Sequence, residues 1–169
     1  QSGDQKEAAA LKILSEILGG GQTSVLTRKL EFESRTAVYT DAFYDETTLD
    51  SSRFTLVVVP APDVSLPEAE AALDATLAEL IETGVDPDQL ARIKFQIKAA
   101  QIYALDNPSS LAPRYRHALT TGLTVEDVQA WPDILDSVTA EDVMAAAERL
   151  FDDRRSVTGY LTQPDGAAG

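Results

Sequence analysis

The chain has 169 residues, 44% of them hydrophobic, so it is long and apolar enough to fold as one domain around a sizeable core. Its formal net charge of -14 disfavours nucleic acid and anionic membranes as partners, because both would be repelled. The absence of cysteine excludes disulfides and thiolate chemistry but leaves the redox compartment open.

The first predicted element is an amphipathic helix that ends at a run of three glycines, residues 19–21. Its apolar residues recur at intervals of three or four: Ala8, Leu11, Leu14 and Leu18. A second short helix is predicted from a cap at Thr23 or Ser24 to Leu30. The glycines therefore separate two helices.

Three strands are predicted. Residues 35–44 are rich in β-branched and aromatic types, and residues 53–59 form a nearly continuous apolar run suited to a central strand. The stretch DETTLDSS between them is predicted to be a hairpin connection. A closing strand is expected at SVTGYLTQ, residues 156–163.

Several helices are predicted between residues 67 and 151. One begins at Pro67 and stops at Gly84, and the next opens with a cap at Asp86, Pro87 and Gln89. The flank of this second helix that carries Phe95, Ala99 and Ile102 is expected to be covered as well as its main apolar face.

The following helical segments carry clear start signals and internal prolines. Residues 107–122 are expected to form a helical piece broken by Pro108 and Pro113. Thr124 with Asp127 opens a helix that runs towards Trp131 and Pro132, and Thr139 with Asp142 opens the last one.

This order of elements predicts an α+β fold, a two-layer sandwich in which helices cover one face of a small, mainly antiparallel sheet. We expect a single domain over residues 4–164, with flexible ends at 1–3 and 165–169. The start QSGDQKE has no signal-peptide core, so no signal peptide is expected within this segment.

The sequence offers little catalytic chemistry. His117 is the only histidine, and neither HxxEH nor HExxH nor a glycine-flanked serine elbow occurs. Pairs such as Glu68 with Glu70, or Glu126 with Asp127, sit at predicted helix N-termini, where capping already accounts for them. We therefore expect no catalytic residue, metal ligand or cofactor in this segment.

The glycine run is a poor phosphate loop, because a helix precedes it and Gln22 follows it in place of a lysine. Two compatible hypotheses remain. The run punctuates two helices, or it also exposes backbone on which an extended peptide can rest.

A set of motifs in order along the chain resembles a known family: ALKILSEILGGGQTSVLTRKL, AVYTDAFYD, DSSRFTLVVVPAP, LAELIETGVDPDQLARIKFQIKAAQIYALDN, VTAEDVMAAAERLF and SVTGYLTQP. Together they resemble the second, C-terminal-type and non-zinc-binding domain of a pitrilysin/insulinase-type (inverzincin) zinc metallopeptidase. The resemblance covers nearly the whole chain. It implies a processing-peptidase-like α+β domain, with zinc held by HxxEH and a downstream glutamate in a first domain outside this segment.

The resemblance also implies partners. In this family two halves close around an unfolded peptide, and halves that lack zinc usually carry an arginine followed seven residues later by a tyrosine. Here Glu31 and Val38 stand at those places, so the domain resembles the companion of the zinc-binding domain. The partner half with the arginine/tyrosine pair would come from the same or another chain. Bacterial relatives imply a periplasmic or otherwise extracytoplasmic location.

The resemblance further implies that a substrate peptide adds as a strand beside the glycine turn. The expected substrate-binding residues are Gly19, Gly20, Gly21, Gln22, Ser24, Val38, Tyr39 and Asp41. The domain would then line the peptide chamber and support the HxxEH domain. Two alternatives stay open: a non-catalytic structural or assembly subunit of the same family, and a small α+β domain whose resemblance is accidental.

Overall fold

The computed structural model describes residues 4–45, 52–105, 108–152 and 156–162. Its elements are α1 (Gln5–Gly19), the π-helix η1 (Thr27–Glu33), β1 (Ala37–Tyr44), β2 (Phe54–Pro60), α2 (Leu66–Thr83), α3 (Pro87–Leu105), α4 (Pro108–Thr120), α5 (Val125–Ser137) and α6 (Ala140–Leu150). The predicted flexible ends, and most of the predicted hairpin connection, lie outside the described residues.

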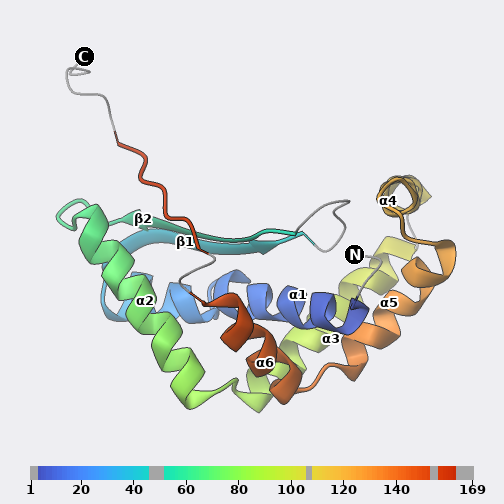
Figure 1. Ribbon diagram of the computed structural model, residues 1–169, viewed down its shortest axis with the longest axis horizontal. Helices are drawn as coiled ribbons and strands as arrows, with labels where there is room; N and C mark the ends of the chain where they lie inside the picture. The colour runs from blue at the N-terminus through green and yellow to red at the C-terminus, as the bar shows by residue number, and fades with distance from the viewer. Residues whose placement is uncertain (1–3, 46–51, 106–107, 153–155, 163–169) are drawn as a thin grey trace.

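Helix α1 is the centre of the fold. Its residues Ile13, Leu14, Ile17 and Leu18 are fully buried, because the sheet covers one side of the helix and α3, α5 and α6 cover others. Figure 1 shows α1 beneath the two strands, with α3, α5 and α6 on that same side. The α+β class and the antiparallel pairing are confirmed, whereas the two-layer detail of the sandwich stays a prediction.

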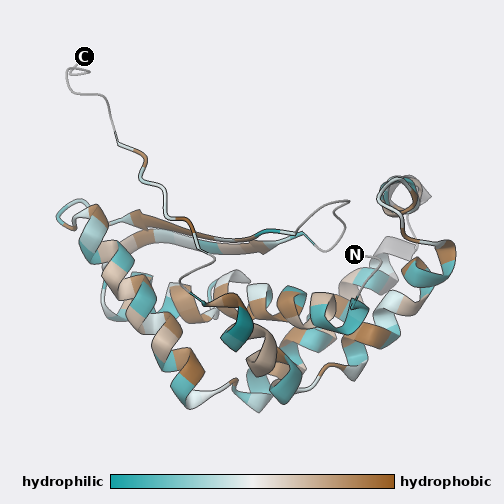
Figure 2. Cartoon of the chain, in the orientation of Figure 1, coloured by the Kyte–Doolittle hydropathy of each residue, from teal (hydrophilic) through white to brown (hydrophobic). Residues whose placement is uncertain are grey.

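The strands β1 and β2 pair over nearly their whole length, from Ala37 opposite Pro60 to Tyr44 opposite Phe54. A register irregularity between Ala37 and Tyr39 makes Val38 an extra residue, as in a β-bulge. Beyond the bulge, alternate residues face the core and the solvent. Figure 2 shows hydrophobic residues along both strands, and Tyr39, Phe43 and Val59 are among those exposed to solvent.

Helix starts follow the local sequence closely. Ser65, Thr124 and Thr139 cap α2, α5 and α6 through complete capping boxes with Glu68, Asp127 and Asp142. The predicted start of α3 is also confirmed, since the Asp86 carboxylate accepts the Asp88 N–H at 2.9 Å.

The helix break predicted at Pro113 is wrong, because Pro113 lies inside α4, which begins at Pro108. The next helix, predicted to run towards Pro132, continues through that proline to Ser137. A proline removes one backbone hydrogen bond, but Val128 and Leu135 on either side of Pro132 are buried, so packing holds α5 together.

Three further expectations need correction. The short second helix is a π-helix that runs past Leu30 to Glu33, and the Ser34 N–H bonds the Lys29 carbonyl five residues back. Residues 156–162 form no strand; residues 156–160 line a cavity of about 520 Å³ together with β2 and α2, and the Tyr160 hydroxyl donates to the Glu70 carboxylate of α2. The outer flank of α3 is only partly covered: Phe95 is 73% exposed and Ala99 is half-buried, while the Ile102 side chain lies outside the described residues.

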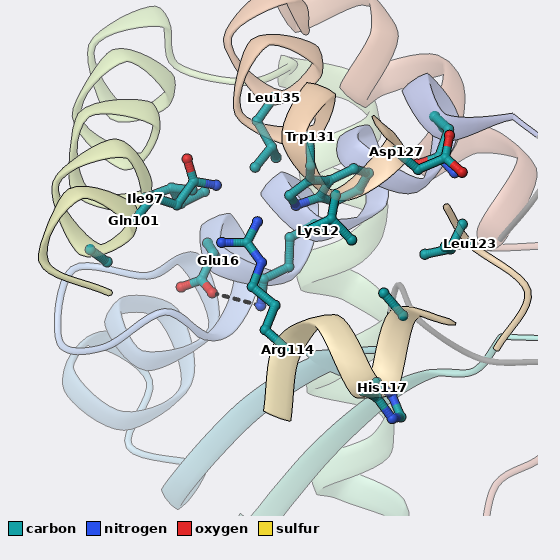
Figure 3. Close-up of a pocket in the computed structure, with 14 residues that line it drawn as sticks. Lys12, Glu16, Ile97, Gln101, Arg114, His117, Leu123, Asp127, Trp131 and Leu135 are labelled. Carbon is teal, nitrogen blue, oxygen red and sulfur yellow. Dashed lines mark ion pairs between the residues drawn. The ribbon is translucent and has the colours of Figure 1, made fainter. Parts of the chain in front are cut away.

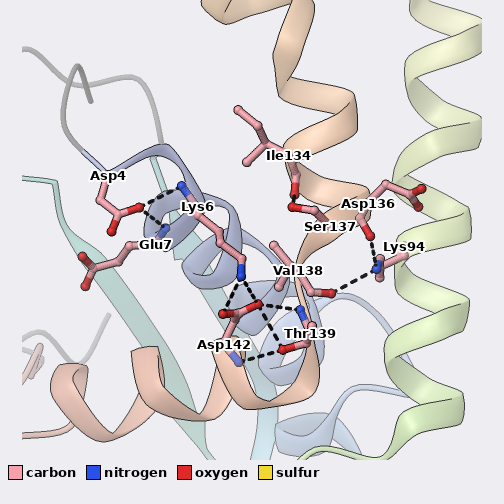
Figure 4. A network of polar contacts seen from close by, with 10 residues as sticks. All are labelled: Asp4, Lys6, Glu7, Lys94, Ile134, Asp136, Ser137, Val138, Thr139 and Asp142. Carbon is pink, nitrogen blue, oxygen red and sulfur yellow. Dashed lines mark hydrogen bonds and ion pairs between the residues drawn. The ribbon is translucent and has the colours of Figure 1, made fainter.

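Polar contacts join the helices beneath the sheet (Figure 4). Lys6 of α1 reaches both carboxylate oxygens of Asp142 in α6, at 2.8 and 2.7 Å. Lys94 of α3 donates to the carbonyls of Asp136 and Val138, where α5 ends. These contacts fix the junction between α5 and α6 against α1 and α3.

Candidate functional site: the glycine turn and the outer face of the sheet

The glycine turn lies directly against β1. A Cβ built on Gly19 would come within 2.1 Å of the Ala42 amide nitrogen, so only glycine allows this approach. The structure thus brings together the two segments, glycine turn and first strand, from which the predicted peptide-binding residues come.

The rest of the turn is exposed. A Cβ on Gly20 would lie 2.5 Å from the Glu16 carbonyl oxygen, whereas Gly21 has a φ of 97° and open space around it. Gln22 is exposed next to it. The Gln89 side chain of α3 donates to the Thr23 carbonyl at 3.3 Å and to the Ile17 carbonyl at 3.5 Å, which ties the turn to α3.

Ser24 lies inside the fold, with only 2% of its surface exposed. Its hydroxyl donates to Thr27 at 3.1 Å, the Thr27 and Thr40 hydroxyls are 3.2 Å apart, and Thr40 donates to the Glu31 carboxylate at 2.6 Å. This hydroxyl chain (Ser24, Thr27, Thr40 and Glu31) joins the turn, η1 and β1. Ser24 shapes the turn from within.

The outer face of the sheet (Tyr39, Asp41 and Phe43 of β1 with Thr55, Val57 and Val59 of β2) presents apolar groups to solvent. Tyr39 is opposite Val59 and Phe43 is opposite Thr55. Tyr39, Phe43 and Val59 are 48%, 51% and 43% exposed, and the bulge residue Val38 is 57% exposed. Phe43 and Val59 were not among the predicted site residues, although two-residue alternation from Tyr39 points to Phe43.

Asp41 organises the middle of β1. Its carboxylate accepts the Tyr39 hydroxyl at 2.7 Å and the Ala42 N–H at 2.7 Å. The hydrogen bond to Asp41 raises the pKa of the Tyr39 hydroxyl above its ordinary value, and the nearby Glu31 adds to this effect. In the described part of the chain β1 pairs only with β2, and the Asp41 carboxylate bonds the backbone N–H of the next residue of β1.

Glu31 and Val38 occupy the positions at which zinc-free halves of the family usually carry an arginine and a tyrosine. Glu31 lies on η1 and accepts the Thr40 hydroxyl, and Val38 is the exposed bulge residue of β1. Arg28, the nearest arginine before Glu31, is near Glu33 at 4.0 Å on the same helix. Neither position carries a cation or a phenol.

No metal chemistry is assembled in the described residues. No group of three or more histidine, cysteine, aspartate or glutamate side chains there is placed to hold a metal ion. The whole sequence has one histidine and no cysteine, so these residues do not fit a zinc site. His117 is exposed on α4. None of the described helices is long and apolar enough to cross a membrane.

Comparison with solved structures shows the fold of a peptidase domain. The inactive peptidase domain of a presumed zinc protease from Bordetella parapertussis matches with a TM-score of 0.80 at 17% identity, over 95% of this chain and 87% of that one. A protease from Helicobacter pylori matches with a TM-score of 0.80 at 22% identity, over 88% of this chain. The match spans 35% of the Helicobacter chain, so the present chain corresponds to about a third of it.

The fold is that of a domain found in zinc peptidases, and the described residues bring together no set of metal-ligating side chains. A sequence model of the Peptidase M16 inactive domain matches residues 1–97, and the chain belongs to that family. This confirms the resemblance to a C-terminal-type domain of a zinc metallopeptidase. No curated protein gave a significant match.

Proposed function

We propose that this domain lines the peptide chamber of a zinc metalloendopeptidase and supports the zinc-binding HxxEH domain, without catalytic residues of its own. The observation that carries the proposal is the outer face of the sheet beside the glycine turn. Exposed aromatic and aliphatic groups lie there next to exposed turn backbone, a combination suited to an extended peptide of variable sequence. The zinc would be held in another domain of the parent.

In this proposal the peptide N-terminus lies along β1, near Gly20, Gly21 and Gln22. The peptide backbone forms hydrogen bonds with the edge of β1 as an added strand. Asp41 releases the Ala42 N–H and binds the peptide α-amine instead. Gly19 and Ser24 contribute indirectly, because one sets the turn against the strand and the other anchors it from inside.

The companion domain is proposed to pack on the outer flank of α3. Phe95 and Tyr103 lie eight residues apart on one flank of this helix and are 73% and 77% exposed. Such aromatic groups are typical of a surface that another protein covers. A partner half bearing the arginine/tyrosine pair would close the chamber from the opposite side, and an extracytoplasmic location stays a prediction.

Affinity for matched peptides tests the chamber role. An unstructured ten-residue peptide amide, labelled near its C-terminus, would be titrated by fluorescence anisotropy with a free and with an acetylated N-terminus. We expect the free amine to bind about two to five times more tightly, the range of an exposed ion pair. Asp41→Asn should remove this difference, and Asp133→Asn, an equal charge change on α5, should keep it.

The same titration separates the two function classes. A structural or assembly subunit needs no peptide groove, so the absence of saturable binding by either peptide would favour that alternative. Equal affinity of both peptides, unchanged by Asp41→Asn, would leave the chamber role but reject the role proposed for Asp41.

A further inference from the structure

A second hollow lies away from the sheet, between α1, α3, α4 and α5. Its volume is about 420 Å³, within the range of small-molecule sites. Apolar side chains form much of its wall, among them Ile97, Leu123, Trp131 and Leu135. Figure 3 shows these side chains around the hollow: Ile97 comes from α3, Trp131 and Leu135 from α5, and Leu123 from the turn between α4 and α5. Such a cavity favours a ligand with an apolar body.

The charged groups around this cavity are not equivalent. Lys12 pairs with Glu16 at 3.2 Å, and the Asp127 carboxylate is held by the Thr124 N–H and hydroxyl at 2.8 and 2.9 Å. Within the described residues, Arg114 of α4 has no ion pair, and its side chain lines the cavity half-buried. Figure 3 shows its guanidinium reaching over the hollow towards Trp131. One cation is therefore left facing an apolar space.

We propose that this cavity binds an apolar carboxylate, whose hydrocarbon or aromatic body fills the space beside Trp131 and whose carboxylate pairs with Arg114. A guanidinium matches a carboxylate with two parallel hydrogen bonds, and the apolar walls strengthen that pair by excluding water. The net charge of -14 disfavours a polyanion such as a nucleotide, whereas a monoanion with a large apolar part gains from burial. The inference is independent of the chamber role.

An apolar carboxylate of this kind can be a free carboxylic acid or the C-terminal residue of a peptide with an apolar side chain.

Trp131 is the only tryptophan of the chain, so its fluorescence reports occupancy of the cavity directly. Wild-type protein would be titrated with decanoate and decanamide, and with acetyl-Ala-Ala-Leu as the free acid and as the amide. These pairs differ in the carboxylate alone.

We expect at least one acid to change the Trp131 emission saturably and to bind about tenfold or more tightly than its amide, as a charge-assisted contact predicts. Binding of decanoate alone identifies a free acid, binding of the peptide acid alone identifies a peptide terminus, and binding of both supports either source. Arg114→Gln should lower the affinity to that of the amide, and Arg114→Lys should restore part of it.

Arg116→Gln is the matched control, because Arg116 is exposed on the same helix and does not line the cavity. Ala100→Phe should block binding by filling the mouth from α3, where the Ala100 side chain is exposed. Equal affinity for acid and amide in the wild-type chain, or no saturable change with any of the four compounds, would overturn the proposal whatever the variants do.

Discussion

Gly19 and Ala42 are in direct backbone contact, which fixes the glycine turn against β1. A side chain at position 19 would have to lie 2.1 Å from the Ala42 nitrogen. The contact joins the end of the most buried helix to the strand that carries Tyr39 and Asp41. Any role of the turn in peptide binding therefore depends on a contact that also holds the core together.

Alanine at two of the glycines should separate packing from backbone conformation. Gly19→Ala should lower the free energy of unfolding by about 3 kcal/mol, the upper range for overpacking, because β1 must move. Gly21→Ala should cost about 1 kcal/mol, since its φ of 97° is strained for alanine but the space around it is open. Urea denaturation of both variants measures the difference, and a larger loss for Gly21→Ala would contradict the close packing of Gly19 against Ala42.

The hydroxyl chain of Ser24, Thr27, Thr40 and Glu31 should contribute measurably to stability. Thr27→Val keeps the shape of the side chain but leaves the Ser24 and Thr40 hydroxyls without this partner, so we expect a loss of about 1–3 kcal/mol. Thr83→Val is the control, because that exposed hydroxyl bonds only its own helix carbonyl, and its effect should stay within about 0.5 kcal/mol. Equal urea midpoints would show that the buried chain is energetically neutral.

Stability should fall in acid through Asp142. The hydrogen bond from Lys6, with those from Thr139, holds the pKa of this carboxylate below its ordinary value of 3.8. A lowered pKa in the folded state stabilises the fold above the unfolded value, and this stabilisation is lost as the pH falls through the folded pKa. The urea midpoint should therefore fall as the pH drops below the ordinary aspartate value of 3.8. Asp142→Asn should flatten that drop.

The control for the acid profile is Asp133→Asn, a change at an exposed aspartate of α5. It should leave the acid dependence as in the wild type. If Asp142→Asn and the wild type lose stability in parallel over the whole acid range, the Lys6–Asp142 contact does not carry the pH dependence.

The outer flank of α3 should matter for association and not for folding. Phe95→Ser should change the free energy of unfolding by less than about 0.5 kcal/mol, because the side chain is 73% exposed. It should weaken binding of the proposed zinc-binding companion domain by about tenfold or more if the ring is buried there. Calorimetric titration against that domain measures this, with Gln96→Ser, an exposed α3 residue, as the control. If Phe95→Ser binds with unchanged affinity, the outer flank of α3 is not the surface that contacts this domain.

Helix starts could be predicted from the sequence because capping depends on residues that are close together in the chain. The boxes of Thr124 and Thr139 were readable because a cap and its partner lie three residues apart in the chain. The π-helix was not, since it differs from an α-helix by one extra residue in a turn that packing against β1 selects. The break predicted at Pro113 was wrong because α4 continues through it, as α5 continues through Pro132 with Val128 and Leu135 buried on either side.

In the candidate site, too, local features could be predicted from the sequence, whereas tertiary contacts could not. Exposed glycines and a β-rich strand were visible in the sequence, but their contact through Gly19 and Ala42 joins residues that are far apart in the chain. Ser24 bonds Thr27 of η1, which in turn meets Thr40 of β1, and the cavity beside Trp131 is lined by residues of four helices. Neither could be inferred without the fold.

Backbone amide chemical shifts in the isolated domain test the central claim most directly. The probe is an unstructured peptide with a free N-terminus and a C-terminal amide, so that it cannot supply the carboxylate proposed for the cavity at Arg114. The largest shift changes are predicted at residues 20–22 and 38–41. Saturable shifts confined to other surfaces, or the absence of saturable shifts, would contradict the chamber role.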